Sequence, residues 1–284
     1  MINRFMRKES IKFPLVLVIM VFVAFGGCSS SHQLSRQKAI GESVLLNQNV
    51  MAILWYQRAA ETRALYYQAF NVAHDRLSEI LKNDTSDVRK AVVVDIDETV
   101  LNNSPYQAMN IIDNVTYPIG WKKWTASAEA KATPGSVQFL NYAYRHDVDV
   151  YYVTNRNIDE MAGTLHNLRK LGFPQAEKSH LLMKTTTSNK TKRRKEIRKT
   201  HKIVLLCGDN LGDFDQLFQH HSSKTRNELV DQYSSKFGEK FIVLPNPMYG
   251  EWEGTTYHYK WGMNARQKAK VRKKALNYYH INDK

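Results

Sequence analysis

Hydrophobic residues follow two different spacings along this chain. Between residues 38 and 82, apolar side chains recur every three or four positions, with no proline and with Gly41 as the only glycine, which predicts helix. After residue 87, short and almost wholly apolar runs alternate with longer amphipathic stretches. The apolar runs cover residues 91–94, 148–153, 180–183, 203–207 and 241–244. The amphipathic stretches lie near 136–146, 158–171, 189–200 and 213–236 and have helical spacing.

Apolar runs separated by amphipathic helices are typical of a parallel sheet that is covered on both faces. Right-handed crossovers between such strands produce a doubly wound core. We therefore predict an α/β fold, with a doubly wound parallel-sheet core and a smaller helical accessory subdomain. An N-terminal helical region would span residues 38–87 and the core residues 88–284. The core would contain a long insertion at 102–133, which overhangs the site, and a basic C-terminal helix.

The first 27 residues have the layout of a secretory signal peptide. A positively charged start is followed by an apolar run from Phe13 to Phe25 and by Gly26 and Gly27. Small residues directly before Cys28 resemble a bacterial lipobox, in which that cysteine is lipidated, although Phe25 stands where leucine is usual. Residues 28–37 would then be a lipidated tether. The alternative is an uncleaved membrane anchor.

Ser29 follows Cys28, so no aspartate is present there to favour retention in the inner membrane. We therefore expect a bacterial outer-membrane lipoprotein that is periplasmic or surface-exposed. Without Cys28, the remaining thiol is Cys207, which excludes an intramolecular disulfide and is expected to pack as a small hydrophobic residue.

The formal net charge of +14 favours anionic partners, including phosphorylated substrates. Two segments, 184–202 and 260–274, carry much of the excess and are interpreted as solvated helix faces. The first segment has no aromatic residues between its charges, whereas sites for single-stranded nucleic acid combine the two. Nucleic-acid binding is therefore not expected.

Polar and acidic residues follow four of the predicted strands. Ligands of open parallel sheets bind beyond the carboxyl ends of the strands, so these residues are candidates for a common site. In chain order, the candidates are Asp95, Asp97, Thr154, Asn155, Lys184, Asp209 and Asp213.

The residue types in this set suit phosphoryl transfer. A carboxylate such as Asp95 can attack phosphorus, provided that a hard divalent cation reduces the repulsion between the two anions. Asp95 and Asp209 offer the oxygen ligands that Mg²⁺ prefers, and Asp97 is placed to protonate the leaving alcohol and then activate water. Thr154 and Lys184 would contact the phosphoryl oxygens.

Two segments carry a resemblance to a known family. Residues 93–106 read VVDIDETVLNNSPY and residues 208–214 read GDNLGDF. This pair of motifs resembles the class C acid phosphatases, bacterial surface lipoproteins of the haloacid dehalogenase superfamily that act on nucleotides. The resemblance extends through most of the mature chain, including residues 54–57, 153–156 and 244–254.

The resemblance implies a role for each candidate. Asp95 would be the nucleophile and a metal ligand, Asp97 the acid/base and a ligand through its carbonyl, and Asp209 the third protein ligand of Mg²⁺, with Asp213 in support. Thr154, Asn155 and Lys184 would hold the phosphate. Trp121 and Tyr249 would sandwich the nucleoside base, for which surface-to-core packing is the alternative.

These observations predict a Mg²⁺-dependent acid phosphatase that hydrolyses nucleoside 5′-monophosphates through an aspartyl phosphate. Two alternatives remain at this point. One is a broad phosphomonoesterase without base preference, and the other is a non-catalytic lipoprotein that binds a ligand on the cell surface.

Overall fold

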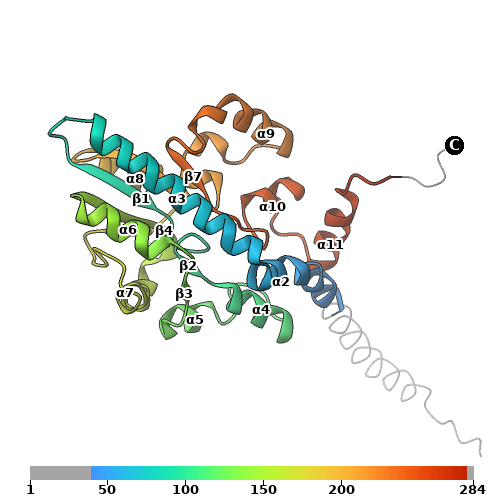
Figure 1. Ribbon diagram of the computed structural model, residues 1–284. Helices are drawn as coiled ribbons and strands as arrows, with labels where there is room; N and C mark the ends of the chain where they lie inside the picture. Colours follow the sequence, from blue (N-terminus) through green and yellow to red (C-terminus); the bar gives the residue numbers. More distant parts are fainter. Residues whose placement is uncertain (1–39, 280–284) are drawn as a thin grey trace, which may run out of the picture.

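Five parallel strands form the centre of the computed structural model, which describes residues 40–279 (Figure 1). The strand order is β5–β4–β1–β6–β7. The strands are β1 (Lys90–Val94), β4 (Val148–Asn157), β5 (Leu181–Lys184), β6 (Lys202–Gly208) and β7 (Phe241–Val243). The chain moves outward from β1 to β5, returns to β6 beside β1, and then moves outward to β7. The predicted doubly wound α/β fold is therefore confirmed.

Both faces of the sheet are covered, as the continuous apolar runs predict. Side chains alternate between the faces of a strand, and β1 shows this clearly. Val92 and Val94 belong to one buried cluster, and Ala91 and Val93 belong to the other. Helices α3 (Ala60–Asn83), α6 (Ser136–Arg145) and α7 (Met161–Lys170) contribute to the first cluster, and α8 (Thr191–Arg198) contributes to the second.

The N-terminal helical region consists of more than one helix. Residues 40–47 are helical, α2 spans Val50–Arg58, and α3 begins after a break at Ala59, which has extended φ and ψ angles. These helices share the core of the sheet. Phe70 of α3 packs on Phe139 of α6 with ring centroids 5.8 Å apart, and Leu77 is fully buried in the same cluster. The helical part of the fold thus continues the sheet's hydrophobic core.

The insertion after β1 contributes side chains to the cavity at the carboxyl ends of the strands. It contains β2 (Leu101–Asn102), α4 (Ser104–Ile112), α5 (Trp121–Ser127) and β3 (Lys131–Ala132), and β2 and β3 pair as a short antiparallel sheet. Near the same end of the molecule lie α10 (Glu251–Thr256) and the basic helix α11 (Ala265–Lys274) (Figure 1). These segments surround the site described below.

The predicted helix over 213–236 is wrong in its extent. The structure instead has the 3₁₀ turns η2 (Leu211–Asp213), η3 (Gln216–Phe218) and η4 (Ser234–Lys236), with α9 restricted to Ser223–Gln232. Short polar side chains interrupt the helix here by accepting hydrogen bonds from backbone N–H groups. Asp215 accepts a hydrogen bond from the Leu217 N–H at 3.0 Å, and Ser222 caps α9 by accepting from the Thr225 N–H at 3.2 Å.

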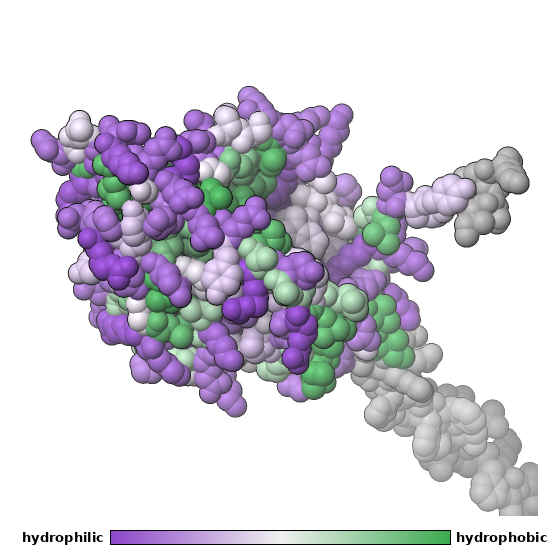
Figure 2. Space-filling view, in the orientation of Figure 1, coloured by the Kyte–Doolittle hydropathy of each residue, from purple (hydrophilic) through white to green (hydrophobic). Residues whose placement is uncertain are grey.

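The visible surface is mainly hydrophilic, with apolar residues in small separate groups (Figure 2). Within residues 40–279, no helix is both long and apolar enough to cross a membrane. The predicted signal peptide, the tether and Cys28 lie outside the described residues.

Candidate active site

Three carboxylates meet where the chain reverses its direction across the sheet. Asp95 follows β1, Asp209 follows β6, and Asp213 ends η2. One carboxylate oxygen from each lies within 4.8 Å of the other two. The Asp95 N–H continues the pairing of β1 with β6 by donating to the Cys207 carbonyl at 2.9 Å. Backbone pairing therefore brings the first two carboxylates together, as the strand-end argument predicts.

A glycine allows the third carboxylate to approach. A Cβ atom on Gly208 would lie 2.4 Å from the Asp213 side chain, which is closer than non-bonded atoms can come. Arg194 holds the same turn from α8, because its Nη1 donates to the Asp213 carbonyl at 2.8 Å and to the Gly212 carbonyl at 3.1 Å. The position of Asp213 is thus fixed by residues on two sides.

The electrostatics of this cluster favour a bound cation. Burial, together with the charges of Asp213 and Asp97, raises the pKa of Asp95 to about 7 against the opposing charge of Lys190. Burial also raises the pKa of Asp209, together with the charges of Asp213 and Asp95. Carboxylates that are costly to ionise together are stabilised by a proton or a cation. Three hard-oxygen donors, of which Asp95 and Asp213 are buried and Asp209 is half-buried, fit a divalent metal ion, and these are the residues that would hold it.

The side chain of Asp97 is held apart from this cluster. Arg156, on β4, donates to one Asp97 carboxylate oxygen from Nη2 at 2.8 Å and from Nε at 3.0 Å, and Asn103 donates to the same oxygen at 2.8 Å. Arg156 is only 2% exposed, so its guanidinium is a fixed part of the site. This arrangement leaves Asp97 oriented and partly accessible from the cavity.

Thr154 and Asn155, at the end of β4, take different positions. Thr154 is fully buried and its hydroxyl accepts a hydrogen bond from the Arg156 N–H at 3.1 Å. Asn155 lines the cavity, and its side-chain oxygen accepts from Arg193 Nη2 at 2.8 Å. Arg193 also donates to the Thr154 carbonyl. Arg193, on α8, therefore supports this end of β4.

The structure does not bring Lys184 to the site. It ends β5, which lies two strands away from β1, or roughly 10 Å at ordinary strand spacing. Lys190, on the loop that leads into α8, occupies the place expected of Lys184. Its ammonium lies 2.6 Å from Asp213 and also contacts Asp95. Lys184 was predicted because it follows an apolar strand, but that strand, β5, lies at the edge of the sheet, away from β1 and β6.

Burial alone would lower the pKa of Lys190, but the charges of Asp213 and Asp95 outweigh this effect and raise it. Lys190 and Arg194 are 4% and 2% exposed. The interpretation of residues 184–202 as a solvated face is therefore wrong for these two residues. Lys190 contacts the carboxylates of the acidic cluster, and Arg194 holds the turn that carries Asp213.

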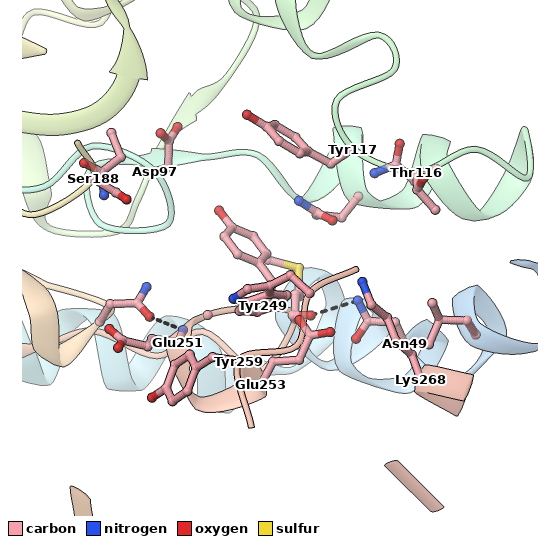
Figure 3. Close-up of a pocket in the computed structure, with 18 of the residues that line it drawn as sticks. Asn49, Asp97, Thr116, Tyr117, Ser188, Tyr249, Glu251, Glu253, Tyr259 and Lys268 are labelled. Atoms are coloured by element: carbon pink, nitrogen blue, oxygen red, sulfur yellow. Dashed lines mark hydrogen bonds between the residues drawn. The ribbon is translucent and has the colours of Figure 1, made fainter. Parts of the chain in front are cut away.

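Aromatic residues line the cavity beside the acidic cluster. Trp121 is 9% exposed, because Tyr106 and Tyr117 pack edge-on against it and the Arg156 guanidinium lies 5.6 Å from its ring centroid. Tyr117 itself is 59% exposed and was not among the residues predicted from the sequence. Figure 3 shows Tyr117 and Tyr249 on opposite walls of the cavity.

Tyr249 is anchored by a residue of the first motif. Its hydroxyl donates to the carboxylate of Glu98, which is fully buried and also accepts from the Asn103 N–H at 2.7 Å. Burial and the charges of Asp97 and Asp209 raise the pKa of Glu98. On the other side, Tyr66 of α3 donates to the Glu98 carbonyl. The loop after β1 therefore fixes both the acidic cluster and one aromatic wall.

Comparison with known proteins agrees with this geometry. The family described as HAD superfamily, subfamily IIIB (Acid phosphatase) matches residues 25–252. A class C acid phosphatase structure from Bacillus anthracis is similar, with a TM-score of 0.81 and 44% identity, over 84% of this chain and 100% of that chain. A structure of the class C acid phosphatase from that organism with tungstate bound has a TM-score of 0.80 and 43% identity, over the same shares of the two chains.

Two plant proteins are more distant relatives. The stem 31 kDa glycoprotein of Glycine max is 26% identical over 201 residues, which are 68% of this chain and 69% of that protein. Acid phosphatase 1 of Solanum lycopersicum is 26% identical over 174 residues, which are 57% of this chain and 60% of that protein. The chain therefore belongs to subfamily IIIB of the haloacid dehalogenase superfamily, the acid phosphatases, and is a phosphoric monoester hydrolase.

Proposed function

We propose that this acid phosphatase hydrolyses nucleoside 5′-monophosphates with Mg²⁺ as cofactor and with Asp95 as the nucleophile. The observation that carries the proposal is the separation of two carboxylates of the first motif. Asp95 faces the buried acidic cluster and Lys190, whereas Arg156 and Asn103 hold Asp97 outside that cluster. Two carboxylates in different environments suit two different chemical roles.

In the first step, an Asp95 carboxylate oxygen forms a bond to phosphorus as the bond from phosphorus to the leaving oxygen breaks. Asp97 gives its proton to that oxygen, so that the product leaves as an alcohol. In the second step, Asp97 takes a proton from water, and the water oxygen attacks phosphorus. As this bond forms, the bond from phosphorus to the Asp95 oxygen breaks, inorganic phosphate leaves, and the Asp95 carboxylate and protonated Asp97 are restored.

Lys190 supports both steps, since its fixed ammonium lies where negative charge develops on the phosphoryl oxygens. A divalent cation bound by Asp95, Asp209 and Asp213 would reduce the repulsion between the attacking carboxylate and the phosphate. Mg²⁺ is proposed because carboxylate oxygens are the donors that it prefers. The similar Bacillus anthracis structure has tungstate bound, and tungstate, like phosphate, is a tetrahedral oxyanion, which supports oxyanion binding by this chain.

The preference for nucleotides rests on the rings beside the phosphate site. A flat base fits between Tyr117 and Tyr249, with Trp121 as an adjoining wall. Stacking on an aromatic ring stabilises any base by about 1–3 kcal/mol, so purine and pyrimidine nucleotides should both bind. A broad phosphomonoesterase without base preference remains the second candidate, because Trp121 already packs on Tyr106.

Phosphate release from 5′-nucleotides, 3′-nucleotides and an aryl phosphate, with and without chelator, tests the proposal. We expect faster turnover of 5′-nucleotides, complete loss of activity after chelation, and recovery with Mg²⁺. Equal kcat/KM values on all substrates would favour the broad phosphomonoesterase. Full activity after exhaustive chelation would exclude the metal-dependent mechanism.

We also propose that Cys28 carries the lipid that anchors the enzyme to the outer membrane. The support is the signal-like sequence that ends in Gly26 and Gly27. Cys28→Ser should release the protein from the membrane fraction or leave it unprocessed, with Cys207→Ser as the matched control. Lipidation and membrane fractionation like those of the unaltered protein would place the anchor elsewhere.

A further inference from the structure

The cavity extends past the two tyrosines that are proposed to hold the base. Its volume is about 1110 Å³, which exceeds the roughly 300–1,000 Å³ of ordinary small-molecule pockets. Figure 3 shows Asp97 and Ser188 toward one end, Tyr117 and Tyr249 in the middle, and Lys268 toward the other end. The part beyond the two tyrosines has no role in the mechanism above.

Lys268 is a positively charged residue of this distal part. The Lys268 ammonium, on α11, lies 5.5 Å from the Tyr257 ring centroid and 5.7 Å from that of Trp261. Within residues 40–279, Lys268 takes part in no ion pair with a carboxylate. An ammonium that lines a cavity and lacks an anionic partner is suited to bind an anionic group of a ligand.

The other charged residues of the distal part do not cancel this lysine. Glu253 is paired with Arg272 at 2.5 Å, so the two charges largely neutralise each other. Glu42 supplies one negative charge and Arg266 a further positive one. The distal part therefore keeps a net positive charge, whereas the catalytic end is rich in carboxylates.

The wall that carries Lys268 is held in place by contacts to the N-terminal helices. Gln48 donates to the Ala269 carbonyl at 3.2 Å, and Asn49 donates to the Met248 carbonyl at 2.9 Å (Figure 3). Trp261 lines the same part of the cavity and remains 48% exposed, so part of its ring is accessible to a ligand. A positive group beside an exposed ring is a combination that binds successive nucleotides of a single strand.

We infer that the distal part of the cavity is a second subsite, for a leaving group that extends past the tyrosines and carries a further anionic group. This inference rests on the proposed function. It assigns the enzyme a class of longer substrates, the simplest of which is a 5′-phosphorylated dinucleotide. Its terminal phosphate lies at Asp95 and its first base between the tyrosines. Its phosphodiester meets Lys268, and its second base stacks on Trp261.

Phosphate release from 5′-phosphorylated diadenylate, 5′-AMP and phenyl phosphate tests the inference with the full chain. The measured quantity is kcat/KM for the dinucleotide divided by kcat/KM for phenyl phosphate. In Lys268→Gln this ratio should fall about tenfold, the effect of losing one charge-assisted hydrogen bond, and Lys268→Arg should restore most of it. Lys270→Gln is the matched control, because Lys270 lies on the same helix and is exposed to solvent.

An unchanged ratio in Lys268→Gln, or an equal loss in Lys270→Gln, would overturn the inference. So would a dinucleotide that is hydrolysed no better than phenyl phosphate. These results differ from a failure of the proposed function, in which 5′-AMP itself would show no advantage over phenyl phosphate.

Discussion

The ammonium of Lys190 lies 2.6 Å from the carboxylate of Asp213 and also contacts that of Asp95. It reaches this position from the loop that leads into α8. The contact joins the two halves of the sheet at the point where the chain reverses direction, and it places a permanent positive charge beside the proposed nucleophile.

Replacing this lysine should affect turnover far more than replacing the lysine that the strand-end argument selected. Lys190→Gln removes the charge and should lower kcat/KM by about 100-fold, as for loss of one stabilising donor at a reacting oxyanion. Lys184→Gln, with Lys184 at the end of the edge strand β5, should change kcat/KM less than about twofold. Steady-state kinetics on one 5′-nucleotide would decide it, and the reverse order of effects would contradict the assignment.

The two hydrogen bonds from the Arg156 guanidinium should be needed to orient the Asp97 carboxylate. Arg156→Lys keeps the charge but loses the paired contacts from Nη2 and Nε to one carboxylate oxygen. We expect kcat to fall by roughly 100-fold with a much smaller change in KM, because the orientation of a proton donor affects the chemical step. The exposed Arg198→Lys serves as control. A change confined to KM would mean that Arg156 binds substrate instead.

The two tyrosines should contribute to nucleotide selectivity. Tyr117→Ala and Tyr249→Ala should each raise KM for 5′-nucleotides by an amount equivalent to about 1–3 kcal/mol, with little change for phenyl phosphate. Trp121→Ala should instead lower stability, by roughly 3–5 kcal/mol, because this ring is mostly buried. Kinetics and urea unfolding of the three variants separate these roles, with exposed Tyr144→Ala as control. Equal losses on every substrate would assign the tyrosines to packing.

Acid should destabilise the protein partly through Asp149. Burial would raise the pKa of this carboxyl, but hydrogen bonds from Gln175 and His201 and the charge of Arg89 outweigh burial and lower it. A carboxyl with a depressed folded-state pKa adds stability above its unfolded value, and this stability disappears as the pH falls toward the folded value. In urea unfolding between pH 6 and pH 2.5, Asp149→Asn should therefore lose less stability than the unaltered protein. Parallel losses would exclude this role.

Much of the fold could be predicted because β1 and β6 are buried on both faces and read as continuous apolar runs. The same reasoning located Asp95 and Asp209, since parallel pairing brings the ends of adjacent strands together. Other features depend on tertiary packing. Lys190 and Arg194 lie in a basic segment whose composition is that of a solvated helix, and only their burial against η2 distinguishes them.

The break at Ala59 also lacks a sequence signal, because neither glycine nor proline occurs there. The structure explains it by a local bond, in which the Thr62 hydroxyl donates to the Trp55 carbonyl at 2.8 Å. A threonine side chain that bonds to the backbone competes with regular helix geometry. The anchoring of Tyr249 by Glu98 was not predictable either, since it joins residues that are 151 positions apart.

The central claim is that Asp95 becomes phosphorylated, and direct detection of the intermediate tests it. Asp97→Asn should be mixed with 4-nitrophenyl phosphate, whose leaving group needs no proton, and quenched in acid. Phosphorylation can then proceed while hydrolysis lacks its base, so the intermediate should accumulate. Mass spectrometry of peptides should find one phosphoryl group on Asp95. A phosphoryl group on another residue, or none during continued turnover, would contradict the account.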